Sequence, residues 1–441
     1  MQLIQQILFI IISGISIYLF ARKVVEIRRN IMLGRKEDLT DNPGQRWKNM
    51  ALLALGQKKM FKRPIPAILH LFVYVGFIII NIEILEIILD GITGQHRLFA
   101  PMLGSLYGIL IGCFEILAVL VLAGCAIFLA RRNIIKTPRL VQNELDGWPK
   151  NDANLILIME IVLMTLFLAM NTADLVLQER GAEHYTVTDS FWITGMFTGL
   201  FSGLSDGTLI AIERGGWWLH IVGVFFFMNY LPYSKHFHII VSFPNAYYMR
   251  LKKQGEMKNM PEIQNEVLYM MEPDKAPTDA APAEPQRFGA KDVMDLSWKN
   301  LMDAYACTEC GRCTAMCPAN ITGKKLSPRK IMMDTRDRLE EVGANVNKNK
   351  EFVEDGKTLV HDYITVEELR ACTSCQACVE ACPVSIDPLN IIYQLRRYLI
   401  MEESNSPEEW NLMFGNVENN MAPWKFSPDE RDKWVSEMAE A

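Results

Sequence analysis

The chain has 441 residues, a length that suits two or three domains better than one. Its formal net charge of −6 lacks the basic excess of a nucleic-acid-binding protein, so we expect no nucleic-acid partner. Hydrophobic residues make up 50% of the chain and concentrate in its N-terminal half, whereas the C-terminal half is polar.

Residues 2–20 form an apolar run that no positive charge precedes and that Ala21, Arg22 and Lys23 follow. A secretory signal peptide has the opposite order, with its charges before the apolar core and small residues at a cleavage site after it. We therefore expect an uncleaved first membrane helix with its N-terminus outside.

Four more apolar runs follow, at roughly 65–89, 105–130, 154–177 and 216–241. Each is close to the ~20 residues that a helix needs to cross the hydrocarbon core. Residues 21–63 contain twelve Lys or Arg and residues 131–152 contain five, whereas 90–104 contains one and 179–215 contains two. By the positive-inside rule this asymmetry predicts about five spans in an inner (cytoplasmic) membrane, with the C-terminal domain in the cytoplasm.

Residues 190–212 are moderately apolar but rich in glycine. A sixth span here would move the C-terminal domain outside. Because the glycines and Asp206 make a poor lipid-facing helix, we expect an interfacial or re-entrant segment on the outer face.

Histidines in the apolar runs indicate a haem site. His70 lies near the start of the second run, and His220 and His238 lie on the last, 18 residues or about five helical turns apart. On a continuous helix His236 would face nearly the opposite way. The predicted topology places His70 and His238 at matched depth near the cytoplasmic side, as a bis-histidine haem b requires.

A second haem is less well supplied with ligands. His220 lies nearer the outer side, where the second run offers Ile80 and Glu83 at matching depth, and His96 is a weak substitute. We expect one haem, with His220 as a possible second site. A structural or interfacial role for these histidines, without haem, stays open.

Carboxylates also occur within the apolar runs, where ionisable groups are costly. A quinone exchanges protons together with electrons, so a neighbouring carboxyl can serve as its proton donor or acceptor. Hydrogen bonding between helices is the alternative role for each of them. The candidates for quinone or proton chemistry are Glu83, Glu115 and Glu160.

The composition divides the chain into three parts: residues 1–245 form the membrane domain, 246–290 an interfacial segment and a Pro- and Ala-rich linker, and 291–441 the polar domain. Residues 320–371 have a helical pattern with a Gly- and Asn-rich break at 343–349. Little strand pattern is present. The predicted fold class is all-α, a transmembrane helix bundle fused to an α-helical ferredoxin domain.

Two cysteine runs in the polar domain read C-x-x-C-x-x-C-x-x-x-C-P. In two-cluster ferredoxins the fourth cysteine of each run ligates the cluster of the other run. Zinc or disulfides are the alternatives, but zinc sites usually pair two C-x-x-C units. We assign one [4Fe–4S] cluster to Cys307, Cys310, Cys313 and Cys382, and the second to Cys372, Cys375, Cys378 and Cys317.

The membrane half resembles the cytochrome b (gamma) subunit of respiratory nitrate reductase. The resemblance rests on the segment PYSKHFH, residues 232–238, on the spacing of His220 and His238, and on His70. It implies that these histidines bind haem. Ile80 stands where that subunit has the second histidine of its second helix, so a ligand of the outer haem is missing.

The polar half resembles the cluster-binding subunit of heterodisulfide reductase and membrane oxidoreductases that couple electron-transfer flavoprotein to menaquinone. The resemblance lies in residues 295–328, which include ACTECGRCTAMCP, and in residues 371–399. It implies a soluble partner, either a CCG-domain iron–sulfur subunit or electron-transfer flavoprotein. No CCG motif occurs in these 441 residues, so we expect that module on a separate subunit.

The predicted function is that of an oxidoreductase subunit anchored in the membrane. Electrons from the soluble partner would pass through two [4Fe–4S] clusters and haem b to menaquinone or another quinone. Three alternatives remain: a quinone-linked redox subunit for thiol–disulfide chemistry, a redox-sensing anchor without haem, and an ion pump that uses the buried carboxylates.

Overall fold

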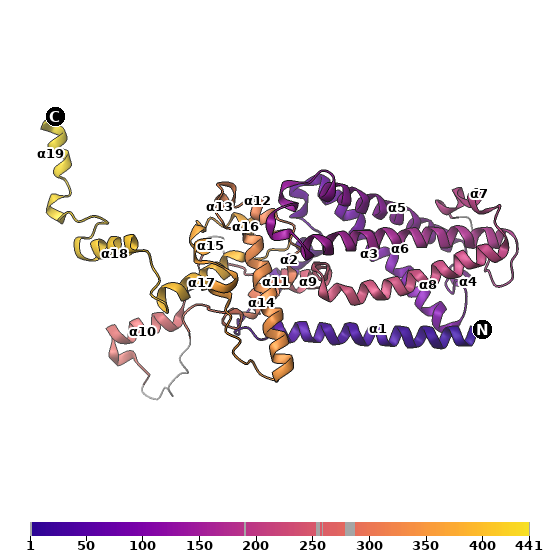
Figure 1. Ribbon diagram of the computed structural model, residues 1–441, viewed down its shortest axis with the longest axis horizontal. Helices are drawn as coiled ribbons and strands as arrows, with labels where there is room; N and C mark the ends of the chain where they lie inside the picture. Colours follow the sequence, from indigo (N-terminus) through magenta and orange to yellow (C-terminus); the bar gives the residue numbers. More distant parts are fainter. Residues whose placement is uncertain (1, 189–190, 253–255, 258, 278–286, 441) are drawn as a thin grey trace.

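The computed structural model describes residues 2–188, 191–252, 256–257, 259–277 and 287–440. Within these residues the secondary structure is helical, apart from two isolated backbone bridges. Figure 1 shows an elongated molecule, with a bundle of long helices at one end and a domain of shorter helices at the other. The all-α prediction is confirmed.

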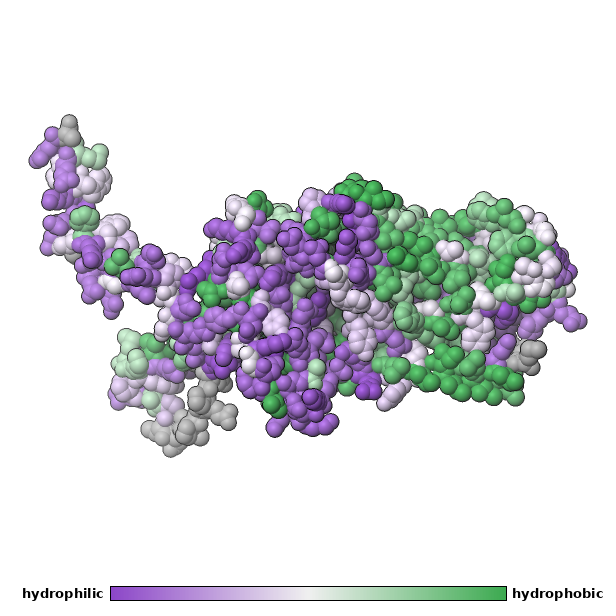
Figure 2. Space-filling view, in the orientation of Figure 1, coloured by the Kyte–Doolittle hydropathy of each residue, from purple (hydrophilic) through white to green (hydrophobic). Residues whose placement is uncertain are grey.

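Five helices are long and apolar enough to cross a membrane, which confirms the predicted count. Their lipid-facing side chains form the green half of the molecule in Figure 2, and the polar domain forms the purple half. An apolar surface of this extent is stable in lipid rather than in water. The helices are α1 (Gln2–Ile31), α3 (Pro64–Thr93), α5 (Ser105–Asn133), α6 (Trp148–Glu179) and α8 (Asp206–Tyr230).

Shorter helices lie at the ends of the bundle, and local sequence explains where the long ones begin and end. α3 begins at Pro64, whose missing N–H removes no hydrogen bond because the N–H groups of a first helical turn have no partner within the helix. The helix stops before Gly94, whose backbone is in the left-handed conformation (φ 73°). α6 packs against α5 and α8, and α5 packs against α3. The short helices of this half are α2 (Pro43–Met50), α4 (Ala100–Leu103), α7 (Thr198–Phe201) and α9 (His238–Tyr247).

The predicted boundaries of the last span are wrong at both ends. α8 begins at Asp206, because the Ser205 side chain accepts a hydrogen bond from the Thr208 N–H and caps it. The segment 190–212 is therefore split: residues 206–212 belong to the span, and residue 190 lies outside the described residues. α8 ends at Tyr230, and two 3₁₀ turns, Leu231–Tyr233 and Lys235–Phe237, lead into α9.

The polar domain is built from helices packed around the cysteine loops. α14 runs unbroken through residues 343–349, so the predicted break there is wrong. The helix instead ends at Lys350, which is left-handed (φ 74°). The helices are α11 (Trp298–Ala306), α12 (Arg312–Ala315), α13 (Pro318–Ile321), α14 (Pro328–Asn349), α15 (Val366–Ala371), α16 (Ala377–Ala381) and α17 (Pro388–Met401).

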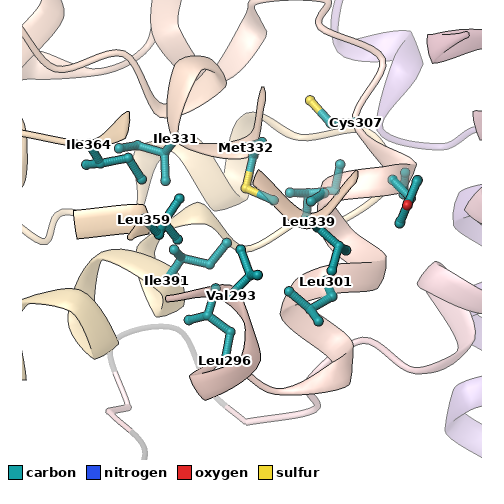
Figure 3. Packing of buried hydrophobic residues seen from close by; sticks show 14 of the residues in the cluster. Val293, Leu296, Leu301, Cys307, Ile331, Met332, Leu339, Leu359, Ile364 and Ile391 are labelled. Carbon is teal, nitrogen blue, oxygen red and sulfur yellow. The ribbon is translucent and has the colours of Figure 1, made fainter. Parts of the chain in front are cut away.

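One hydrophobic core holds this domain and continues into the bundle. Figure 3 shows Val293, Leu296 and Leu301 packed near Leu339, with Cys307 at the edge of the group. Ile27 of α1, Phe227 of α8 and Phe237 belong to the same cluster of buried side chains. The two halves of the protein therefore pack against each other through apolar contacts.

Three further helices lie outside this core and are largely exposed: α10 (Pro261–Met271), α18 (Glu408–Asn420) and α19 (Lys433–Glu440). In Figure 1 the last two extend away from the body as an arm. Of the predicted linker, residues 278–286 lie outside the described residues.

The contact between α14 and α1 gives a first testable prediction. A Cβ atom on Gly343 would lie 2.4 Å from the Asn30 side-chain nitrogen. Asn30 is fully buried and donates to the Tyr305 hydroxyl (3.3 Å), so it has no room to move. Gly343→Leu is expected to destabilise the docked domain by about 1–3 kcal/mol, measured as a lower thermal unfolding midpoint in detergent.

The matched control is Gly415→Leu in α18, where nothing lies within 4 Å of the corresponding Cβ position. Equal unfolding midpoints for the two variants would show that the contact between α14 and α1 contributes no measurable stability.

Candidate functional site

The two cysteine runs adopt the same backbone conformation. Cys307 directly follows α11 and Cys372 directly follows α15, and each loop then leads into a short helix, α12 or α16. These short helices pack against each other. In each loop the second and fourth residues after the first cysteine are left-handed: Glu309 (φ 54°), Gly311 (φ 70°), Ser374 (φ 58°) and Gln376 (φ 63°).

The loops bring together cysteines of different runs. Cys382, the last of the second run, interacts electrostatically with Cys313 and Cys310 of the first. Cys317 likewise interacts with Cys372 and Cys378. A cavity of about 30 Å³ lies among four thiols, those of Cys307, Cys310, Cys313 and Cys382.

The chemistry of these donors fits iron–sulfur clusters. All eight cysteines are free of disulfide bonds. Within the described residues, no group of three or more His, Cys, Asp or Glu side chains is placed to hold a single metal ion. Burial raises the pKa of Cys307 to about 12 and that of Cys382 to about 11, whereas the neighbouring Arg312 lowers the pKa of Cys310 against the effect of burial.

The first cysteine loop is anchored to the membrane half. Glu309 is buried and accepts hydrogen bonds from Lys235, which precedes α9, and from Arg336 of α14 (2.8 Å). Arg139, in the loop after α5, donates to the Cys310 carbonyl oxygen. In the second loop, by contrast, the Cys375 thiol is exposed.

A cavity of about 370 Å³ lies where this loop meets the bundle. His70 of α3 lines it, and so do His236 and His238 on the opposite segment. The wall nearest the polar domain includes Cys310 and Arg312. Histidines and a cluster loop that are far apart in the sequence therefore share one cavity.

Hydrogen bonds orient two of these histidines. His70 Nδ1 lies 3.1 Å from Gln57 Oε1, and His238 Nδ1 lies 3.1 Å from the Lys235 carbonyl oxygen. With the proton on Nδ1, each ring donates to that oxygen and leaves Nε2 for a metal. Both rings would therefore leave Nε2 available to a metal.

Three further polar atoms at the cavity make no hydrogen bond within the described residues: Tyr74 OH, Arg132 Nη1 and Ser242 Oγ. Tyr74 follows His70 by one helical turn, and Ser242 follows His238 by one turn, so each hydroxyl lies on the face of its histidine. Buried polar atoms normally have partners. A haem b fits His70, His238, Arg132 and Ser242, because its iron takes two histidines and its carboxylates take an arginine and a hydroxyl. The Tyr74 hydroxyl is not needed for this group.

The structure places His236 differently from the sequence prediction. His236 lines the cavity with His238, and the two ring centroids are 5.2 Å apart. The predicted opposite orientation is wrong because α8 ends at Tyr230 and the chain then changes direction in 3₁₀ turns. The signal in the sequence was Pro232, which cannot donate within a helix.

The remaining histidine candidates lie elsewhere. His220 is buried in α8, with Nδ1 3.0 Å from the Leu163 carbonyl oxygen. His96 accepts from the Thr186 N–H (3.2 Å) and lies 3.4 Å from Asp174. A second cavity, at the opposite end of the bundle, is lined by His96 but not by His220.

The three candidate carboxylates occupy different surroundings. Glu160 lines the histidine cavity, whereas Glu83 lines the second cavity, among charged residues of the bundle end. Glu115 of α5 accepts hydrogen bonds from the Ile193 N–H (2.9 Å) and the Thr194 N–H (3.2 Å), and so links α5 to the loop before α7. The structure therefore brings only Glu160, of the three, to the histidines.

Comparisons with known proteins support the iron–sulfur assignment. Residues 306–386 match the 4Fe-4S dicluster domain family. The chain is similar to the probable iron-sulfur-binding oxidoreductase FadF of Bacillus subtilis, at 28% identity over 466 aligned residues that cover 98% of this chain and 61% of that protein. It is 26% identical to the EtfAB:quinone oxidoreductase of Syntrophomonas wolfei over 429 residues, 90% of this chain and 55% of that protein.

A third relative gives a shorter match. Over 120 residues, this chain is 33% identical to one subunit of the ferredoxin/F(420)H(2)-dependent CoB-CoM heterodisulfide reductase of Methanosarcina acetivorans. The alignment covers 27% of this chain and 60% of that subunit. The chain spans less than two thirds of each of these relatives. No solved structure gives a significant match. The relatives are iron–sulfur oxidoreductases, and this chain carries a 4Fe–4S dicluster domain on a bundle of five membrane-type helices.

Proposed function

We propose that the protein carries electrons between a soluble partner and a quinone in the membrane, through two [4Fe–4S] clusters and one haem b. One observation supports this most directly: His70 and His238 line the same cavity as Cys310. A relay needs its cofactors held at short and fixed spacing, and the protein's part is to hold them there.

Different residues bind the haem and the two clusters. His70 and His238 hold the haem through Nε2, and Arg132 and Ser242 bind its carboxylates. When bound, the clusters and the haem supply one-electron transfer. One cluster is held by Cys307, Cys310, Cys313 and Cys382, beside the haem cavity, and the other by Cys372, Cys375, Cys378 and Cys317.

Exposure indicates the order of the two clusters. Cys375 is exposed, whereas Cys310 is only partly exposed and its loop is hydrogen-bonded to Arg139 of the membrane half. The cluster of Cys375 is therefore the one that a soluble partner reaches first. We infer that electrons enter there and leave through the cluster beside the haem.

The distribution of basic residues indicates which end of the helix bundle faces the cytoplasm. Arg28 and Arg29 end α1 and Arg131 and Arg132 end α5, all at the end of the bundle that faces the polar domain. By the positive-inside rule this end faces the cytoplasm, which leaves the N-terminus outside an inner membrane. A cytoplasmic position also keeps the cluster thiols reduced.

The names of the relatives suggest the partner. An EtfAB:quinone oxidoreductase among them favours electron-transfer flavoprotein or a CCG-domain iron–sulfur subunit as donor, with menaquinone or another quinone as acceptor. The match to a heterodisulfide reductase favours a second candidate, in which the partner carries out thiol–disulfide chemistry.

Purification in mild detergent with the bound partners tests the proposal. We expect a b-type absorption band, about nine iron atoms per chain (about eight in the clusters and one in the haem) and co-elution of a flavoprotein or thiol–disulfide enzyme. Chemically reduced protein should reoxidise its haem and clusters when menadione, a soluble naphthoquinone, is added. A preparation with full cluster iron but no b-type band would instead support a redox-sensing anchor.

A further inference from the structure

The histidine cavity has a deep end whose polar groups the proposed haem ligands do not use. Tyr74 OH is buried there without a hydrogen-bond partner among the described residues. Glu160 is only 9% exposed and has no hydrogen bond or ion pair within the described part of the chain, yet it lines the cavity. A buried hydroxyl oxygen and a buried carboxyl that line one cavity without protein partners among the described residues indicate that a polar ligand binds in this cavity.

Helix geometry gives the depth of these groups. At 1.5 Å per residue, Tyr74 lies about 15 Å along α3 from Pro64, and Glu160 lies about 18 Å along α6 from Trp148. Arg132, by contrast, lies next to the end of α5. The cavity therefore runs from a charged mouth beside the cluster loop into the hydrocarbon region.

The deep end also reaches the surface that faces lipid. Phe77 and Ile78, one turn beyond Tyr74, line the same cavity and are 38% and 48% exposed. Both side chains belong to a helix long and apolar enough to span a membrane, so we take their exposed surface as the lipid-facing edge of the cavity. An apolar molecule can therefore enter between these side chains without crossing water.

We propose that this deep end binds the head group of a quinone that enters from the lipid beside Phe77 and Ile78. The Tyr74 hydroxyl donates a hydrogen bond to one carbonyl oxygen, and Glu160 is the proton donor to the other. The site rests on the proposed function, since the electrons come from the relay described above. A quinone has the matching chemistry: two carbonyl acceptors on a ring, and an apolar tail that stays in lipid.

The chemical step balances as follows. Reduction of one quinone adds two electrons, delivered singly by the relay, and two protons, one forming an O–H bond at each carbonyl oxygen. Glu160 transfers its carboxyl proton to one oxygen and becomes a carboxylate. The second proton reaches the other oxygen from solvent at the cavity mouth, which also restores the carboxyl proton of Glu160.

The other carboxylates fit this role less well. Glu115 already accepts hydrogen bonds from two backbone N–H groups. Glu83 has one unpartnered buried oxygen within the described residues, but it lines the cavity at the opposite end of the bundle. Glu83 lies 13 residues beyond His70 on α3, about 20 Å along the axis.

The test compares Tyr74→Phe and Glu160→Gln in the purified holoprotein with its partners. Menadione reduction is followed in the steady state, and haem reduction by dithionite is followed without quinone. We expect Tyr74→Phe to raise KM about tenfold through the lost hydrogen bond, and Glu160→Gln to lower kcat about 100-fold. Haem content and its reduction by dithionite should match the parent.

Two matched controls remove the same groups at exposed positions: Tyr18→Phe on the lipid face of α1 and Glu179→Gln at the end of α6. Both should behave like the parent. Ile78→Trp adds a test of access, because it should slow a quinone with a long isoprenoid tail more than menadione.

The outcomes separate the two proposals. If both variants reduce menadione with parental KM and kcat, the quinone site is wrong while the relay stands. If they alter the haem spectrum and leave quinone kinetics unchanged, Tyr74 and Glu160 contact only the haem, and the site is again overturned. A parent protein that fails to reoxidise with menadione overturns the proposed function itself.

Discussion

Alanine at His70 or at His238 is expected to abolish the b-type absorption of the purified protein and to slow quinone reduction more than about 100-fold. The reason is geometric: the two rings line one cavity from opposite sides, and a hydrogen bond to each Nδ1 leaves Nε2 for the iron. Reduced-minus-oxidised spectra and total haem per chain measure the effect. Iron–sulfur content should stay at the parental level in both variants, because no cysteine is changed.

Two other histidines serve as controls for that result. His220→Ala should keep the absorption band, since His220 bonds to the Leu163 carbonyl oxygen away from the cavity. His236→Ala should also keep it, although His236 lines the cavity. A band that is lost in His236→Ala and kept in His238→Ala would assign the second axial position to His236.

The substitution Cys382→Ser is expected to remove the cluster that Cys310 ligates and to leave the cluster that Cys375 ligates. This result would distinguish the crossed assignment, because Cys382 and Cys375 belong to the same cysteine run. Cys382 lies with Cys310 and Cys313 around one cavity. Iron content should fall to about half, and the electron paramagnetic resonance signal that remains should match that of Cys310→Ser. Electron flow to the haem should stop, because the lost cluster is the one beside the cavity.

The reciprocal variant completes the test. Cys317→Ser should reproduce the spectrum of Cys375→Ser, and Cys113→Ser, an exposed cysteine in α5, should retain both clusters. If Cys382→Ser instead matched Cys375→Ser, each run would bind its own cluster, and the crossed assignment would be wrong.

The sequence was sufficient for the architecture. Each span is an apolar run close to the thickness of the hydrocarbon core, so length and composition alone locate α1, α3, α5 and α6 well. The absence of an alternating pattern in the polar half likewise predicted its helical structure. These features depend on local composition, which a single sequence displays directly.

Features set by tertiary contacts were harder to predict. Gly343 and the asparagines after it have low helix propensity, yet α14 continues through them because Gly343 packs closely against Asn30. The end of α8 was also misplaced, since hydropathy continues into PYSKHFH after the helix has stopped. His236 was misjudged for that reason.

The site itself was only partly visible in the sequence. Cysteine spacing gave the cluster ligands as candidates, and matched depth gave His70 and His238. The shared cavity could not be predicted, because it depends on how the Cys310 loop docks on the bundle. The free hydroxyls of Tyr74 and Ser242 carry no sequence signal at all.

The anchoring of the first cysteine loop has a consequence for how electrons travel. Glu309 joins Lys235 to Arg336, and Trp298 Nε1 donates to the Glu37 carbonyl oxygen (2.8 Å) across the same junction. The cluster domain is thus not a swinging carrier that must diffuse on a tether before each delivery. Under the proposed function, electron transfer into the membrane would occur by tunnelling over a fixed gap and would be insensitive to solvent viscosity, whereas the encounter with a soluble partner would be governed by diffusion.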